Sequence, residues 1–434
     1  MSYRSMRLRN NITHEKQRTG DVLELANSLY PGTSLKLTEK PKGSHCQGGG
    51  STRTRCATAS AGLVSSRLGG RGLAAAAPRG PRVRLLRSMR RACKGGSGCA
   101  AALRLHECVR AVSVAAGSVI PAPHSKIQAG GPRERLALGL FDRLWERYRQ
   151  RVSYVNVYES IIASHGATFF NDHIALRSLA LQQPGMGIFT TGRVFEALGY
   201  RPAECYSFED KHLSAIYFQH PHPQFPKLFI SELRVSDLSA ATQEAIATVT
   251  SASPSYPRSR ARQGAIDGGL LAALRLCDSA SKPAQLQLLD ELVNIFHELP
   301  WAPPDHRLVK EVHSETQYGA WVLVHGNNVN HFTALINSQG VPALNDIGKT
   351  SRALAEAGVP MKPDIEGEAG SNLRQTATFA VNIPCTMSRQ GTEVEMEWPY
   401  AYFELAQRDP APDGSRYEGF FSTQATNLFE MTRR

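Results

Sequence analysis

The stretch Asn-Asp-His-Ile-Ala-Leu-Arg, residues 171–177, decides how this chain is interpreted. It is a short run with the two-residue alternation of a β-strand, so its side chains divide between two faces. His173 and Arg177 then share one face, while the aliphatic Ile174 and Leu176 share the other. The strand therefore presents a histidine and an arginine together on its polar side.

Two later strands carry further candidate ligands. His331 lies in Val-Asn-His-Phe-Thr at 329–333, and Glu404 lies in Tyr-Phe-Glu-Leu-Ala at 402–406. A carboxylate in such an apolar run is costly to bury unless a cation pairs with it. Two histidines and one carboxylate are the ligand set of a non-haem Fe(II) centre. A single histidine on a strand is more often an ordinary core or surface residue, so at this point both interpretations of His173 stand.

Residues directly before the two histidines are suited to hold the imidazole rings. Asp172 and Asn330 each offer a side-chain oxygen that can accept a hydrogen bond from the ring nitrogen facing away from a metal. Two further groups are weaker candidates. The pair His220 and His222 sits in a proline-rich turn and is expected to be exposed, and a second cluster is a less favoured metal site, formed by His306, His313 and Glu315.

Positive charge is concentrated in the front of the chain. Residues 41–131 hold 15 Lys and Arg against one acidic residue, whereas residues 132–434 hold 28 basic and 33 acidic residues. A basic, hydroxyl-rich and acid-poor segment is typical of an organelle transit peptide. We therefore predict that residues 1–131 are a disordered leader, directed to a plastid rather than a mitochondrion, and that residues 135–434 are the folded domain. The lack of aromatic residues in 41–131 disfavours a nucleic-acid-binding tail.

Several classes of protein lack support in the sequence. The cysteines of the body, Cys205, Cys277 and Cys385, are too few for a disulfide framework, and the leader cysteines do not have zinc-ribbon spacings. No run of about eighteen apolar residues predicts a membrane span. No phosphate loop, dinucleotide fingerprint or serine-hydrolase elbow is present. Neither a membrane nor a nucleic acid is an expected partner.

The body alternates between helical and strand patterns, which predicts an α+β fold with a curved sheet around a site. Residues 250–263, rich in Ser, Pro and Arg, are expected to be a surface linker. The expected helices lie at 136–148, 154–163, 187–200, 270–299 and 347–358, and the expected strands at 171–180, 213–218, 227–233, 321–325, 330–336, 376–381, 394–397 and 400–408.

Over residues 135–434 the chain resembles the 2-oxoadipate dioxygenase/decarboxylases, also called hydroxyglutarate synthases, and it looks most like their plant and algal plastid branch. The matching pieces lie in order along the chain, at 171–179, 228–234, 329–333, 373–376, 402–408 and 418–432. The resemblance implies a vicinal-oxygen-chelate-like fold, in which a curved β-sheet elaborated with helices encloses a metal site.

Carried over by position, the resemblance implies that His173, His331 and Glu404 bind Fe(II), that Arg177 binds a substrate carboxylate and that Gln375 lines the substrate pocket. It implies an Fe(II)-dependent enzyme that converts 2-oxoadipate and O2 to 2-hydroxyglutarate and CO2 in lysine catabolism. Two alternatives stay open. The same iron site could act on another 2-oxo acid, or the chain could be a non-catalytic plastid scaffold linked to storage metabolism.

Overall fold

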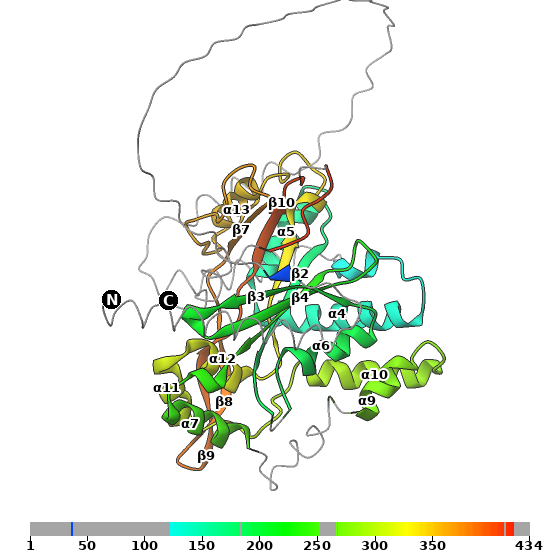
Figure 1. Cartoon of the computed structure of the whole chain (residues 1–434). Helices are drawn as coiled ribbons and strands as arrows, with labels where there is room; N and C mark the ends of the chain where they lie inside the picture. Colours follow the sequence, from blue (N-terminus) through cyan, green and yellow to red (C-terminus); the bar gives the residue numbers. More distant parts are fainter. Residues whose placement is uncertain are drawn as a thin grey trace, which may run out of the picture. The chain divides into compact units, whose positions relative to one another are not determined.

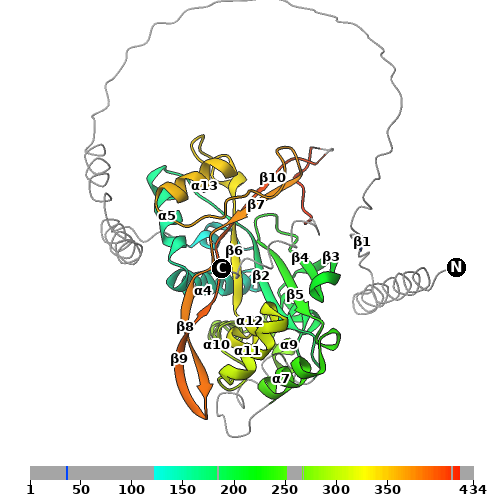
Figure 2. The same ribbon diagram turned by 90° about the vertical axis from the view of Figure 1, so that its left-hand side faces the viewer.

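A curled, mixed β-sheet organises the part of the chain that the computed structural model describes, residues 36–37, 122–182, 185–251, 266, 268–411 and 414–420 (Figure 1). The sheet has eight strands in the order β1-β3-β4-β5-β2-β6-β10-β7. Their bounds are β1 Lys36–Leu37, β2 Asn171–Leu179, β3 Arg201–Phe208, β4 Leu213–Gln219, β5 Lys227–Leu233, β6 Val329–Leu335, β7 Leu373–Ala377 and β10 Glu404–Arg408. A separate hairpin, β8 Asn382–Arg389 with β9 Thr392–Pro399, extends from one end (Figure 2).

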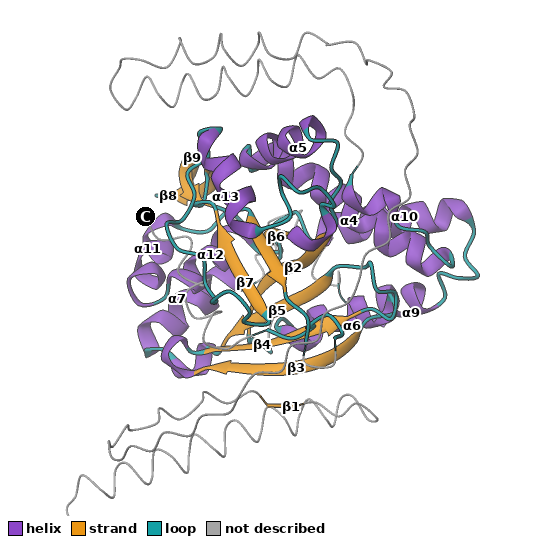
Figure 3. Cartoon of the chain, turned by 90° about the horizontal axis from the view of Figure 1, so that it is seen from above, coloured by secondary structure: helices purple, strands orange, loops and turns teal. Residues whose placement is uncertain are grey.

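Helices lie along several sides of the curled sheet, as the view from above shows (Figure 3). Their bounds are α4 Pro132–Arg151, α5 Tyr154–Ser164, α6 Ile188–Ala197, α7 Ala240–Thr250, α9 Gly268–Arg275, α10 Lys282–Ile295, α11 His306–Glu315, α12 Gln317–His325 and α13 Ile347–Glu356. None of the described helices is both long enough and apolar enough to cross a membrane.

One face of the sheet forms a core with α4. Ile174 of β2 pairs in register with Phe332 of β6, so both side chains lie on this face. The ring of Phe332 is fully buried and meets the rings of Trp145 at 5.1 Å and Tyr148 at 5.0 Å, both edge-on. Because strand side chains alternate, the neighbours of these residues face the opposite side, where the polar groups gather.

Most of the expected elements are present, and the strand predicted at 227–233 is β5 itself. The strand predicted at 321–325 is wrong, since these residues belong to helix α12. This helix is buried on all sides, and an apolar run without periodicity fits a buried helix as well as a strand. The helix predicted at 270–299 is divided into α9 and α10, and Ser281 caps the second of them. Four elements, β3, α7, α11 and β8, were not predicted from the sequence.

Gly319 allows α12 to pack closely against β5. A Cβ atom at this position would lie 2.8 Å from Cγ2 of Thr316, closer than real Cβ contacts, and 3.0 Å from Cδ2 of Leu233, which is tighter than most of them. The hydroxyl of Thr316 accepts a hydrogen bond from the Gly319 amide and so caps the first turn of the helix. The side chains of α12 are thereby held against the middle of the sheet.

The packed body includes residues that the sequence analysis assigned to the leader. A short 3-10 helix spans Pro123–Lys126, and His124 and Ile127 are buried. The ring of His124 lies 3.1 Å from the carboxylate of Asp142 and 3.0 Å from the amide of Asn171. The predictions for residues 1–121 lie outside the described residues except at β1, as does most of the expected linker at 250–263.

Phe332→Ala is expected to lower the free energy of unfolding by about 3–5 kcal/mol, because it opens a cavity in the aromatic core under β6. Leu276→Ala is the control, since that side chain is 65% exposed and its removal should change the stability by no more than about 0.5 kcal/mol. Denaturant unfolding of both variants measures the difference. Equal stability of the two variants would contradict this account of the core.

Candidate metal centre

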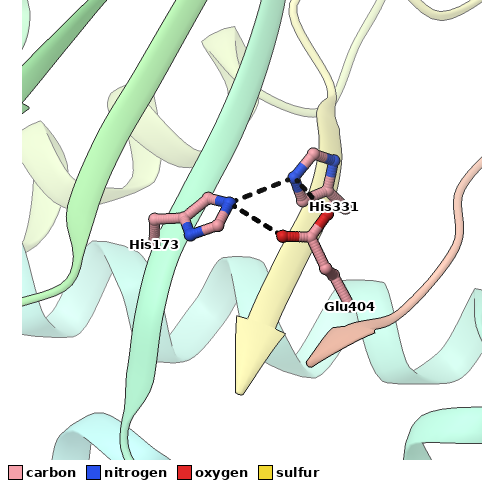
Figure 4. Close-up of side chains that lie close together, drawn as sticks. All are labelled: His173, His331 and Glu404. Atoms are coloured by element: carbon pink, nitrogen blue, oxygen red, sulfur yellow. Dashed lines mark hydrogen bonds and ion pairs between the residues drawn. The ribbon is translucent and has the colours of Figure 1, made fainter. Parts of the chain in front are cut away.

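The register of three neighbouring strands brings the predicted ligands together. On β2, His173 lies opposite Thr333 of β6, and on β10, Glu404 lies opposite the same threonine from the other side. His331 precedes Thr333 by two residues, so its side chain is on the same face of β6. The three side chains converge on one point above the sheet (Figure 4).

The spacing of the ligand atoms suits a single ion. The Nε2 atoms of His173 and His331 are 3.4 Å apart, and Nε2 of His173 lies 3.3 Å from Oε1 of Glu404. Oε2 of Glu404 lies 3.6 Å from Nε2 of His331. Two donors that are each about 2.1 Å from an ion and at right angles to one another are separated by about 3 Å. Within the described ranges, this is the one group of His, Cys, Asp and Glu side chains that could hold a metal ion.

The environment of Glu404 favours a bound cation. Its side chain is fully buried, and Oε1 accepts hydrogen bonds from Nε2 of Gln375 at 2.8 Å and from the hydroxyl of Thr333 at 3.2 Å. Oε2 receives no hydrogen bond from any described residue. A buried carboxylate oxygen without a partner is strongly unfavourable, and a metal ion would remove that penalty.

Neighbouring side chains orient both imidazole rings, as the sequence predicted. Nδ1 of His173 lies 2.9 Å from the carboxylate of Asp172, and Nδ1 of His331 lies 3.0 Å from the side-chain oxygen of Asn330. Each ring therefore turns its Nε2 atom toward Glu404. Such hydrogen bonds fix the tautomer and the orientation of metal-binding histidines.

The two histidines differ in their electrostatic surroundings. Burial, together with the positive charges of His173 and Arg177, holds the pKa of His331 well below its usual value, so this ring is neutral at pH 7. Burial would also lower the pKa of His173, but its hydrogen bonds with Asp172 and Glu404 raise the pKa above the usual value. A metal ion bound at Nε2 of His173 would replace the proton that faces Glu404, while Nδ1 keeps its hydrogen bond with Asp172.

Arg177 lies further along β2 on the same face as His173. Its side chain is 3% exposed, and its guanidinium lies over the rings of Tyr318 at 4.9 Å and Trp321 at 5.3 Å, both from α12. Neither terminal nitrogen has a hydrogen-bond acceptor among the residues described. Burial also lowers the pKa of Arg177. A buried guanidinium held by aromatic rings, with both terminal nitrogens unoccupied, is suited to bind a carboxylate.

The other predicted polar residues lie in different surroundings. Gln375 is on β7 and contacts the ligand Glu404 directly, so its predicted contact with the substrate stays a prediction. His220 was expected to be exposed, but it is buried and stacks on the ring of Phe225 at 4.2 Å. On α11, His313 packs against Trp398 and Glu315 binds the N-terminal end of α7, so these residues form no metal site.

Sequence reasoning missed three residues that shape the centre. Thr333 follows His331 by two residues on a strand, and this spacing was a usable signal. Tyr318 and Trp321 were not found because the sequence around them was assigned to a strand. Their role depends on α12 being a helix that approaches Arg177.

The sequence of this chain matches a known protein family. A model of the 2-oxoadipate dioxygenase/decarboxylase family matches residues 141–428. The chloroplastic 2-oxoadipate dioxygenase/decarboxylase of Arabidopsis thaliana is 27% identical over 286 residues, which cover 60% of this chain and 67% of that protein. The chloroplastic/amyloplastic protein of the same name from Oryza sativa subsp. japonica is 24% identical over 363 residues, covering 78% and 88% of the two chains.

Solved structures share the fold. A glyoxalase superfamily protein from Ralstonia eutropha superposes with a TM-score of 0.56 at 25% identity, covering 67% of this chain and 86% of that one. Hydroxyglutarate synthase from Oryza sativa, solved in complex with 2-oxoadipate, superposes with a TM-score of 0.56 at 22% identity, covering 73% and 97%. The predicted fold, a curved sheet of the vicinal-oxygen-chelate type with added helices, is confirmed.

Proposed function

The chain belongs to the 2-oxoadipate dioxygenase/decarboxylase family, and we propose that it converts 2-oxoadipate and O2 to 2-hydroxyglutarate and CO2. The reaction balances without a second organic substrate, because both oxygen atoms of O2 enter the five-carbon product. A six-carbon 2-oxo dicarboxylate of this kind belongs to lysine catabolism, which we propose as the setting. The observation that carries the proposal is the buried, unpaired guanidinium of Arg177 on the strand that supplies His173.

We propose that His173, His331 and Glu404 hold the metal ion and that the ion is Fe(II). This donor set, with two imidazoles and one carboxylate, is that of the non-haem iron oxygenases. When bound, Fe(II) would supply open coordination positions for a 2-oxo acid and the redox chemistry that activates O2. Gln375 and Thr333 hold one oxygen of Glu404 and leave the other for the ion.

The charges of the site match a dicarboxylate. One divalent ion and Glu404 together carry a single positive charge, and Arg177 adds a second. Four residues along a strand separate His173 from Arg177 by about 13 Å between Cα atoms, and both side chains lie on the same face of β2. Arg177 would bind the carboxylate remote from the reacting end, while the aromatic rings of Tyr318 and Trp321 exclude water around it.

His173→Ala and Glu404→Ala are each expected to abolish Fe(II) binding and turnover together, because each removes one of three ligands. The measurements are anaerobic metal titration of the full chain, followed by oxygen uptake with 2-oxoadipate. His165→Ala is the control, since this exposed histidine forms its hydrogen bonds with residues of α5 and should leave both quantities unchanged. Retained activity in either ligand variant would contradict the assignment.

Arg177→Lys is expected to leave metal affinity unchanged and to lower kcat/KM for 2-oxoadipate by roughly 10- to 100-fold, since a lysine cannot pair in a bidentate manner with a carboxylate. A 2-oxo acid with a single carboxylate is the control substrate, because it has no second carboxylate for Arg177 to bind. An equal loss for both substrates would contradict the role of Arg177 and would favour another 2-oxo acid as the natural substrate.

We propose that the basic segment before the body directs the protein to plastids. The proposal is supported by its composition and by the names of the Arabidopsis and rice relatives, which are called chloroplastic and chloroplastic/amyloplastic. A fusion of residues 1–121 to a fluorescent protein is expected to enter plastids in plant cells. The same fusion with the arginines of 41–121 replaced by glutamine should stay outside, and accumulation of the unchanged fusion in mitochondria would overturn the proposal.

A further inference from the structure

A second buried arginine, Arg408, lies at the end of β10, on the same face as Glu404. Its guanidinium makes a bidentate ion pair with Asp172, with Nε 2.6 Å from Oδ1 and Nη2 2.9 Å from Oδ2. Both side chains are almost completely buried. Paired, hydrogen-bonded charges of this kind hold each other in one orientation far more firmly than a surface ion pair does.

Asp172 connects this ion pair to the candidate metal centre through His173. Oδ2 of Asp172, which accepts from Arg408, is also 2.9 Å from Nδ1 of His173. The guanidinium therefore fixes the carboxylate, and the carboxylate fixes the imidazole that points its Nε2 atom toward the other ligands. Arg408 makes no hydrogen bond with His173, His331 or Glu404, so any influence it has on metal binding is indirect, and Asp172 is one route for it.

The remaining nitrogen of Arg408 binds a segment that we call the C-terminal strap, residues 417–420. Nη1 donates to the carbonyl of Tyr417 at 3.2 Å and to that of Gly419 at 2.8 Å. The ring of Phe420 lies 4.9 Å from the guanidinium, and it meets the ring of His173 edge-on at 5.0 Å. The strap thus contacts the same histidine that Arg408 orients through Asp172.

A second anchor holds the strap from the other side of His173. Lys227 of β5 lies opposite His173 in the sheet register, is buried, and forms an ion pair with Glu418 of the strap. The amide of Phe420 donates to the hydroxyl of Tyr206 at 3.1 Å. The strap is therefore fastened to β5 and β3 on one side of the ligand strand β2 and to β10 on the other side, and the ring of Phe420 packs against His173.

We propose that Arg408 is a positioning residue that couples the orientation of His173 to the packing of the C-terminal strap. The inference rests on the proposed metal-binding function. Coupling of this kind is reciprocal: if the packed strap strengthens metal binding, metal binding strengthens the packing of the strap by the same factor. Only arginine can bind both oxygens of Asp172 and two strap carbonyls at once, so lysine at this position breaks the coupling.

The test compares Arg408→Lys with the full wild-type chain. Anaerobic titration with Fe(II) or with Co(II) alone should show affinity weakened roughly 10- to 100-fold, the range for loss of a group that orients a metal ligand. The Co(II) absorption spectrum should change because the orientation of His173 changes. Arg374→Lys is the matched control, since Arg374 also forms ion pairs beside β10 but contacts no part of the strap or the ligands.

Hydrogen exchange of the strap amides, followed with and without Co(II), tests whether metal binding strengthens the packing of the strap. Metal binding should slow exchange at 417–420 in the wild type and should no longer do so in Arg408→Lys. Asn330→Ala separates weaker metal binding from loss of the coupling, because Asn330 holds His331 and not His173. This variant should bind metal more weakly. Saturating metal should still slow exchange of the strap amides. If Arg408→Lys does not fold, Asp172→Asn replaces it, with the same outcomes expected.

Two results would overturn the inference: metal affinity of Arg408→Lys equal to that of Arg374→Lys, or strap exchange in the wild type that does not respond to metal. Neither result would contradict the proposed metal centre. A wild-type chain that binds no divalent metal would instead contradict the proposed function. The readouts therefore distinguish failure of the coupling from failure of the centre on which it rests.

Discussion

The buried carboxylate of Glu404 is the constraint on which the site depends. It has no exposed surface, one of its oxygens is held by Gln375 and Thr333, and the other has no hydrogen-bond donor among the described residues. An uncompensated buried charge costs several kcal/mol. The sheet register sets two imidazoles beside it, so that a single cation would satisfy the carboxylate and both rings together.

Two arginines define the ends of this site. Arg177 follows the ligand His173 by four residues, and Arg408 follows the ligand Glu404 by four. β2 runs antiparallel to β6, whereas β10 runs parallel to β6, so β2 and β10 run in opposite directions. The two arginines therefore lie toward opposite ends of the centre. Asp172 neutralises Arg408, whereas Arg177 has no carboxylate partner in the described structure. An anionic group of a ligand would therefore be attracted toward the Arg177 end of the site.

Much of this centre could be predicted from the sequence, for a physical reason. Each ligand is a polar residue within an apolar strand, and the two-residue period of a strand fixes the face on which it lies. Helix α12 could not be identified because it is buried all round and lacks the periodicity that marks a helix at a surface. The pairing of Arg408 with Asp172 joins residues 236 positions apart, which only the folded sheet brings together.

The proposed activity is that of an iron-dependent dioxygenase acting on 2-oxoadipate. The most direct test is a reaction of the Fe(II)-loaded full chain with 2-oxoadipate under O2 enriched in the heavy isotope ¹⁸O, with mass spectrometry of the products. We expect 2-hydroxyglutarate that carries two heavy oxygen atoms, one in the new carboxylate and one in the hydroxyl, together with unlabelled CO2. A product without heavy oxygen, or no consumption of 2-oxoadipate by iron-loaded protein, would contradict the proposed activity.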